Sequence, residues 1–179
     1  IRKVLDAGVR TVLIPRVESA DEVRRAVRAA RFVHDGEPGQ RGSASGRAAN
    51  WGAKPDDYAA HEDATTTVGV MIENTAAVAD LEEILAIPDL GFVFIGPGDL
   101  SVSMGHPLET GHPEVVETID SIRAACIDAG VPVGRIANGV EKGSEAVEDG
   151  YQLVRVGGDA AAARQVIGET LSGIRERVD

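Results

Sequence analysis

Five apolar runs of strand length alternate with stretches of helical spacing, and this order most constrains how the chain can fold. The expected strands cover residues 11–17, 68–73, 91–96, 131–136 and 153–156. The expected helices cover residues 19–32, 76–87, 113–129, 139–149 and 159–178. The strands do not alternate apolar with polar residues, as is usual for a sheet covered on both faces. Each strand–helix–strand step is a βαβ unit with parallel strands, so the pattern predicts a parallel α/β architecture.

The missing phosphate-binding motifs narrow the choice among parallel folds. The sequence has neither a GxGxxG segment nor a Walker A loop, so a Rossmann sheet is less favoured than a (β/α)₈ barrel. Five βα units cannot close a barrel that needs eight. We therefore expect either an open sheet or a barrel with about three further units ahead of Ile1. In the second case residues 1–179 are the C-terminal part of one barrel.

Two carboxylates follow successive expected strands. Glu73 ends the run 68–73, and Asp99 follows the run 91–96 after Gly-Pro-Gly. Because parallel strands end at the same edge, about 5 Å apart if adjacent, both acids are expected together at the end that carries the chemistry. Paired oxygen ligands indicate a divalent cation such as Mg²⁺. The alternative is that each acid only caps a helix or lies in a solvated turn. Gly96 and Gly98 favour the metal site, because glycine allows the backbone to approach a ligand closely.

Composition excludes several classes of partner. The net charge of −11 and the isoelectric point near 4.8 argue against nucleic acid. Only three of the 18 basic residues are lysine, which fits either a high-salt organism or an ordinary acidic protein.

Cys126 is the single cysteine, so no intrachain disulfide can form, and its apolar helical face predicts core packing. With no membrane-length apolar run and no signal-peptide pattern, we expect a cytoplasmic protein.

Several segments together resemble a known enzyme family. They are Leu5-Asp6-Ala7-Gly8, Leu13-Ile14-Pro15-Arg16-Val17, Arg41-Gly42, Ile72-Glu73-Asn74, and Phe94 to Ser101 (FIGPGDLS) with Met104-Gly105. The chain resembles the HpcH/HpaI aldolases, metal-dependent class II pyruvate aldolases that include 4-hydroxy-2-oxoheptanedioate aldolase and 2-dehydro-3-deoxyglucarate aldolase. The resemblance implies a (β/α)₈ barrel. It also implies a homo-oligomer, usually a hexamer, whose last helix is exchanged between neighbouring subunits.

The resemblance assigns roles to five residues. Glu73 and Asp99 match the two metal ligands, and Gly98 matches the residue whose backbone N–H holds the pyruvate carboxylate, often alanine in the family. Asp6 matches an acid that orients the catalytic histidine. Met71 stands where several members have a substrate-contacting glutamine, so the usual substrate is in doubt. The family's catalytic histidine and transition-state arginine lie ahead of the segment matching Asp6, so neither has a counterpart here.

The implied reaction joins pyruvate, as a metal-bound enolate, to an aldehyde, or cleaves a 4-hydroxy-2-oxo acid. The implied metal is Mg²⁺ or Mn²⁺, with Co²⁺ a further candidate. The residues themselves support one part of this mechanism. A Schiff-base aldolase needs a lysine at a strand end, and none of Lys3, Lys54 and Lys142 lies in such a run.

The remaining polar residues are expected to be structural. Two histidines, His34 and His61, precede strand 68–73, and two more, His106 and His112, follow Asp99. None is predicted to be catalytic. By its location, His106 would be the best candidate of the four. The connection 34–66 also holds Arg41, Arg47 and Trp51. We place these residues at the N-terminal face of the barrel, which serves stability rather than catalysis. They would have a function only if that face formed a subunit interface. Gly157-Gly158-Asp159 is expected to form a turn and helix cap rather than a phosphate site.

Two other functions remain open. An acyl-CoA lyase of the citrate lyase β-chain or malyl-CoA lyase type shares the barrel and the metal pair, but needs basic groups for CoA, and Arg41 and Arg47 are the only clustered candidates. A non-catalytic relative that has lost its acid–base residues is the second alternative. A histidine and an arginine in the first three units would favour the enzyme.

Overall fold

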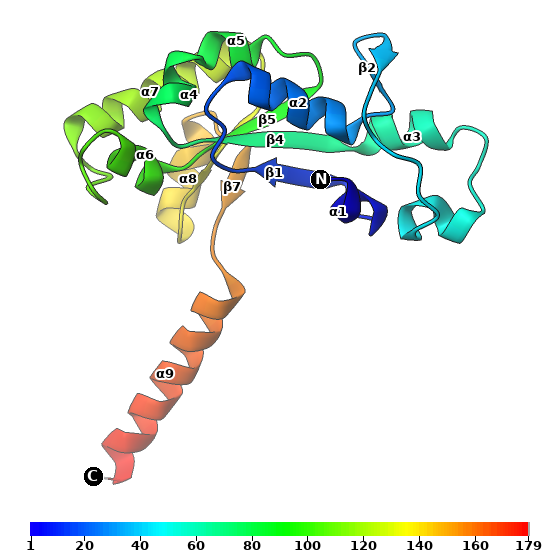
Figure 1. Ribbon diagram of the computed structural model, residues 1–179. Coiled ribbons are helices and arrows are strands. Elements are labelled where there is room, and N and C mark those ends of the chain that lie inside the picture. The colour runs from blue at the N-terminus through cyan, green and yellow to red at the C-terminus, as the bar shows by residue number, and fades with distance from the viewer. Residues whose placement is uncertain (179) are drawn as a thin grey trace.

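The computed structural model describes residues 1–178, and a curled five-stranded parallel sheet forms its centre (Figure 1). The strands are β1 (Thr11–Ile14), β4 (Thr67–Ile72), β5 (Leu90–Ile95), β6 (Val133–Ile136) and β7 (Leu153–Arg155). They lie in the order β1-β4-β5-β6-β7, and every neighbouring pair is parallel. The parallel α/β prediction is therefore confirmed, with the first strand three residues shorter than expected because Pro15 and Arg16 leave the ladder.

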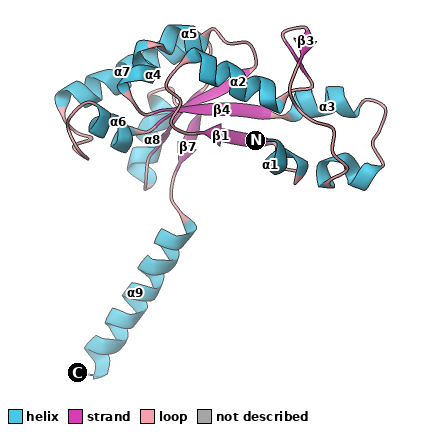
Figure 2. Ribbon diagram, in the orientation of Figure 1, coloured by secondary structure: helices cyan, strands magenta, loops and turns pink. Residues whose placement is uncertain are grey.

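Helices follow the strands, as the alternation predicted (Figure 2). They are α1 (Arg2–Asp6), α2 (Ala20–Ala30), α3 (Tyr58–Thr65), α4 (Thr75–Ala79), α5 (Leu81–Leu85), α6 (Pro97–Ser103), α7 (Pro113–Asp128), α8 (Val140–Glu148) and α9 (Asp159–Val178), with a 3₁₀ segment, η1 (Arg47–Gly52). In Figure 1, α2, α4, α5 and α7 lie along one side of the sheet. Buried side chains from these helices and from the strands form a single core.

Helix α2 shows how local sequence and burial agree. Ser19 caps its N-terminus by accepting a hydrogen bond from the Glu22 N–H, and acidic side chains in the first turn suit the positive end of the helix dipole. Val23 and Val27, four residues apart on one face, are completely buried against the core. The helix is amphipathic because that single face packs on the sheet.

Several local features differ from the expectation, among them the short helix α6, which lies outside the expected helices. The helix expected over 76–87 is divided into α4 and α5 at Asp80, whose Oδ2 accepts a hydrogen bond of 2.5 Å from the Ala20 N–H of α2. A tertiary contact thus stops the helix at a residue that periodicity alone does not mark. The connection 34–66 also contains a hairpin, β2 (Val33–His34) and β3 (Glu37–Pro38), whose Asp35-Gly36 turn has both φ angles positive.

The sheet is open between β1 and β7, which lie at its two edges. A (β/α)₈ barrel requires eight strands, so residues 1–178 supply five of them. Helix α9 extends away from the sheet, and none of its residues is buried (Figure 1). Over the described residues, no helix combines the length and the apolar character needed to cross a bilayer.

Candidate metal and substrate site

Glu73 and Asp99 meet at the carboxyl-terminal edge of the sheet. Strands β4 and β5 are adjacent and end in register, with Ile72 opposite Ile95. Glu73 follows β4 directly, and Asp99 lies in the first turn of α6, which begins just after β5. Both acids line one cavity of about 290 Å³, together with Arg16, Glu18, Asn74, Val102 and Ser103. The predicted convergence of the two carboxylates is therefore confirmed, whereas their role as metal ligands stays a prediction.

The electrostatics of Glu73 favour a cation at this place. Its side chain is buried, with 5% of the residue exposed, and burial raises the pKa of its carboxyl group above the ordinary value. The negative charge of nearby Asp99 raises that pKa further, while the backbone N–H of Arg16, 2.7 Å from Oε1, opposes the shift. Two carboxylates this close repel each other unless a proton or a cation lies between them. An all-oxygen donor set of this kind fits Mg²⁺ or Mn²⁺.

Gly96 is needed for the close approach of Glu73. A Cβ atom at position 96 would lie 2.7 Å from Glu73 Oε2 and 3.1 Å from Met71 Sδ. The thioether of Met71 therefore packs beside the Glu73 carboxylate, at a partly buried position. Gly98, by contrast, has no atom within 4 Å of the place where its Cβ would be. An alanine would therefore fit at position 98 and leave the backbone accessible.

Arg16 is a site residue that our reading of the sequence did not identify. It follows β1 at the same edge of the sheet, in the left-handed region with φ of 56°, and its backbone N–H donates to Glu73. Arg16 also lines the cavity, and its positive charge opposes the rise in the Glu73 pKa. Among the ion pairs of residues 1–178, none involves Arg16. The available signal was Pro15, which cannot donate to a strand ladder and so indicates that the strand ends before Arg16.

Asn74 fixes the two loops that carry Arg16 and Glu73. Its side-chain amide donates to the Val17 carbonyl at 2.8 Å, and its Oδ1 accepts from the Ala77 N–H at 2.9 Å. The same residue thus caps α4 and ties the turn after β1 to the turn after β4. This double hydrogen bonding holds the cavity wall in place.

The structure does not bring Asp6 to this cavity. Asp6 ends α1, which precedes β1, so it lies beyond the opposite edge of the sheet (Figure 1). Its carboxylate is 3.4 Å from the side chain of Arg2. Within the described residues, none of the hydrogen-bond partners of Asp6 is a histidine. The role of Asp6 in orienting a catalytic histidine therefore stays a prediction.

The amino-terminal edge of the sheet is held by a buried ion cluster, as expected for the stability face. Glu62 pairs with both Arg10 and Arg41, and the guanidinium of Arg41 lies over the Phe32 ring. Burial raises the pKa of Glu62, but the two arginine hydrogen bonds more than reverse this, and the net shift is downward. Arg41 is thus occupied in holding the fold. Trp51, on η1, is 78% exposed.

The other predicted structural residues behave as expected where the structure tests them. Cys126 is buried on α7, and burial raises the pKa of its thiol to about 12, so it is a core residue rather than a nucleophile. Asp159 begins α9, and its Oδ1 accepts the Ala160 N–H at 2.7 Å. His34 is buried and contacts Asp89 near the amino-terminal edge.

Comparisons with known proteins agree with the geometry. The family model of HpcH/HpaI aldolase/citrate lyase matches residues 1–165. A 2-keto-3-deoxy-L-rhamnonate aldolase of Escherichia coli O1:K1 is 36% identical over 172 residues, which are 96% of this chain and 64% of that protein. The chain thus spans less than two thirds of the length of the curated relatives it matches.

Two solved structures are also similar. An HpcH/HpaI aldolase/citrate lyase family protein from Burkholderia cenocepacia J2315 superposes with a TM-score of 0.89 at 35% identity, over 97% of this chain and 68% of that one. An HpcH/HpaI aldolase from Desulfitobacterium hafniense DCB-2 superposes with a TM-score of 0.86 at 29% identity, over 98% and 68%. The curled sheet is accordingly part of a (β/α)₈ barrel.

Proposed function

The chain belongs to the HpcH/HpaI aldolase/citrate lyase family, and on that premise we propose that its protein is a metal-dependent aldolase. The reaction would form or cleave a carbon–carbon bond between pyruvate and an aldehyde, and the substrates in cleavage would be 4-hydroxy-2-oxo acids. The observation that carries this proposal is the convergence of Glu73 and Asp99 in one cavity at the carboxyl-terminal edge of the sheet. In parallel barrels this edge carries the chemistry.

Glu73 and Asp99 would hold one divalent cation, Mg²⁺ or Mn²⁺. The bound cation would act as a Lewis acid, stabilising negative charge that develops on a 2-oxo acid. Burial of Glu73 prepares the site, because a desolvated carboxylate beside a second acid gains more from a cation than an exposed one does. The Arg16 N–H fixes one oxygen of Glu73 and leaves Oε2 for the metal.

Other residues in or next to the cavity would position the substrate. The Gly98 backbone N–H, in the first turn of α6 where no intrahelical acceptor is available, would bind the pyruvate carboxylate. The Arg16 guanidinium would pair with an anionic group of the substrate, because Arg16 is the basic residue of the cavity lining. Met71 offers an apolar contact where a polar side chain would hold a hydroxylated aldehyde, so we propose a preference for less polar acceptors.

Proton transfer needs a base that the cavity lining does not include. The lining residues contain no histidine, and we propose that a histidine from a preceding βα unit performs this step. On this proposal residues 1–179 are the C-terminal part of one eight-unit barrel. The chain alone should then show little aldol activity, and a longer form with three more units should restore it. Turnover by the 179-residue chain at the rate of the longer form would contradict this.

An acyl-CoA lyase is the second candidate, because the family model also covers citrate lyases. The observation against it concerns the basic groups. Arg41, which could have bound CoA phosphates, is buried and paired with Glu62 at the opposite edge of the sheet. Assaying cleavage of malyl-CoA or citramalyl-CoA beside aldol cleavage separates the two activities directly.

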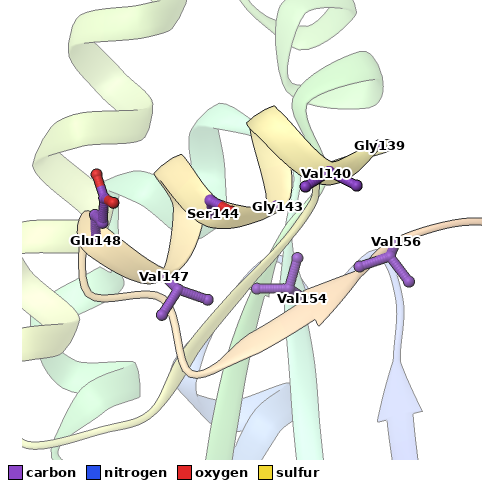
Figure 3. A pocket seen from close by; sticks show the side chains of 8 residues that line it. All are labelled: Gly139, Val140, Gly143, Ser144, Val147, Glu148, Val154 and Val156. Carbon is purple, nitrogen blue, oxygen red and sulfur yellow. The ribbon is translucent and has the colours of Figure 1, made fainter.

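We also propose a homo-oligomer in which α9 packs on a neighbouring subunit. Helix α9 leaves Val166, Ile167, Leu171 and Ile174 more than half exposed. An apolar hollow between α8 and β7, lined by Val140, Val147, Val154 and Val156, is the kind of surface that such a helix covers (Figure 3). Light scattering on wild type and Leu171→Glu tests this; an unchanged mass would contradict it.

The test of the proposed activity uses pyruvate and a short aldehyde with the longest available form of the protein. We expect carbon–carbon bond formation that EDTA abolishes and added Mg²⁺ or Mn²⁺ restores. Activity that persists in EDTA and in Asp99→Asn would show that the metal-dependent mechanism is wrong. A Cys126→Ala variant is a matched control, because this buried thiol is outside the cavity.

A further inference from the structure

The loop between α6 and α7 brings two histidines and a glutamate together, away from the Glu73–Asp99 cavity. One nitrogen or oxygen atom from each of His106, His112 and Glu114 lies within 4.8 Å of the others. His106 Nε2 is 3.1 Å from Glu114 Oε2, and the two imidazole rings are stacked with centroids 3.5 Å apart. None of the three residues lines the cavity of the proposed aldolase site.

The backbone of the loop fixes where these side chains begin. The His106 N–H donates to the Ser101 carbonyl at 2.8 Å, and the His106 carbonyl accepts from the Glu109 N–H at 3.0 Å. The His112 N–H in turn donates to the Glu109 carbonyl at 2.9 Å. Two consecutive turns thus hold the histidines over each other. Pro113 then starts α7 and directs Glu114, in its first turn, towards them.

We propose that His106, His112 and Glu114 form a second metal site, for a borderline-soft divalent ion such as Zn²⁺. Imidazole nitrogens with one carboxylate are a donor set that zinc uses readily, whereas Mg²⁺ prefers oxygen ligands alone. Three protein ligands leave one position for water in a tetrahedral site. The two sites in this chain therefore differ in donor type: oxygen at Glu73 and Asp99, and mostly nitrogen here.

A second observation supports a ligand at this place. The Nδ1 atom of His112 is shielded from solvent and has no hydrogen-bond partner within the described residues. A buried nitrogen without a partner carries a desolvation cost that a coordinated ion would remove. The rings must turn before both can bind one ion, because an imidazole lone pair lies in the ring plane and stacked planes do not meet. Rotation about the Cβ–Cγ bond is soft for histidine and supplies this change.

The bound ion would restrain the helix that carries Asp99. His106 is tied to Ser101 on α6, and the Ser101 hydroxyl donates to the Gly98 carbonyl at 2.7 Å. Ligation of the loop would therefore fix the C-terminal half of α6 and, through it, the turn holding Gly98 and Asp99. This is a structural site, distinct from the cation proposed for catalysis.

The test is equilibrium dialysis of the protein against Zn²⁺ with Mg²⁺ in large excess, followed by elemental analysis. We expect one tightly bound Zn²⁺ per chain, bound at least tenfold more weakly in His106→Ala. Glu114→Gln should weaken it as well and does not endanger folding, because Glu114 is 68% exposed. The controls are His61→Ala, an exposed histidine on α3, and Glu73→Gln; both should keep the Zn²⁺.

Three results would overturn the proposal. The first is that wild type binds no Zn²⁺ under these conditions. The second is that binding survives in both His106→Ala and Glu114→Gln but is lost in Glu73→Gln, which would place the ion at the oxygen site. The third is equal weakening in His61→Ala, which would indicate binding to surface histidines in general. None of these results depends on aldolase activity, so this proposal can fail while the proposed function holds.

Discussion

The backbone N–H of Arg16 donates a 2.7 Å hydrogen bond to Oε1 of Glu73, joining the turn after β1 to the carboxylate that follows β4. This bond orients a buried acid whose pKa is raised first by burial and then by the Asp99 charge. It depends on the backbone of Arg16 and not on its side chain. The two parts of this residue can therefore be tested separately.

Replacing Arg16 by glycine or by alanine should weaken substrate binding without loss of the metal. Both variants keep the N–H that bonds Glu73, and both remove the guanidinium. We expect KM for pyruvate or for an anionic acceptor to rise about tenfold. This change corresponds to the loss of a charged hydrogen bond worth roughly 1.4 kcal/mol. Because φ is 56° at this position, the glycine variant should be about 1 kcal/mol more stable than the alanine variant. Unchanged KM values in both would show that Arg16 does not contact substrate.

Gly96→Ala and Gly98→Ala form a matched pair two residues apart. A methyl group at position 96 would lie 2.7 Å from Glu73 Oε2 and displace the carboxylate, whereas position 98 is open. We expect Gly96→Ala to weaken Mg²⁺ binding at least tenfold, about 1.4 kcal/mol, and Gly98→Ala to bind Mg²⁺ like wild type. Calorimetric titration measures both. Equal affinities would mean that the packing of Glu73 against Gly96 does not control the site.

Much of this arrangement follows from the sequence, and the exceptions have identifiable causes. The strand order and the meeting of Glu73 with Asp99 follow from unbroken apolar runs alternating with helices, because parallel strands leave few alternatives. The division of the helix at Asp80 depends on a bond to Ala20, 60 residues away in the chain, which no local pattern records. The hairpin at Asp35-Gly36, by contrast, has a local signal, because an Asp-Gly pair suits a turn with two positive φ angles. Arg16 was missed because its role depends on a backbone N–H, which every residue but proline has.

Glu62→Gln should destabilise the fold without affecting the metal site. The change leaves buried Arg41 without a charged partner, and the expected loss is about 3–5 kcal/mol in the free energy of unfolding. The exposed pair Asp21–Arg24 gives the control, since Asp21→Asn should cost less than about 1 kcal/mol. Urea unfolding measures both, and similar midpoints for the two variants would contradict the structural role of the cluster.

The same cluster predicts an acid sensitivity of defined sign. The pKa of Glu62 is lowered in the folded protein, so its contribution is complete above about pH 4.5, the ordinary value, and is lost as the pH falls through the folded pKa. Wild type should therefore lose stability more steeply than Glu62→Gln below pH 4.5. Parallel pH profiles would show that Glu62 is not the group responsible.

As the pH is lowered, the Mg²⁺ affinity should begin to fall at a higher pH than it would if Glu73 had the ordinary pKa of a glutamate. The pKa of Glu73 is raised in the metal-free protein, so protons compete with the cation from above pH 4.5, and the carboxylate must be ionised to bind. Titrations from neutral pH downward should show the weakening begin above pH 4.5 in wild type. An affinity that stays unchanged until the pH falls below 4.5 would contradict the raised pKa of Glu73.

Mg²⁺ binding by Glu73 and Asp99 tests the central claim most directly. Isothermal titration of wild type with Mg²⁺ should give one site per chain, and Glu73→Gln and Asp99→Asn should each abolish it while leaving the unfolding midpoint close to that of wild type. Glu109→Gln, an exposed acid in the loop after α6, should bind Mg²⁺ normally. One Mg²⁺ bound with unchanged affinity in both Glu73→Gln and Asp99→Asn would show that the two carboxylates meet for another reason.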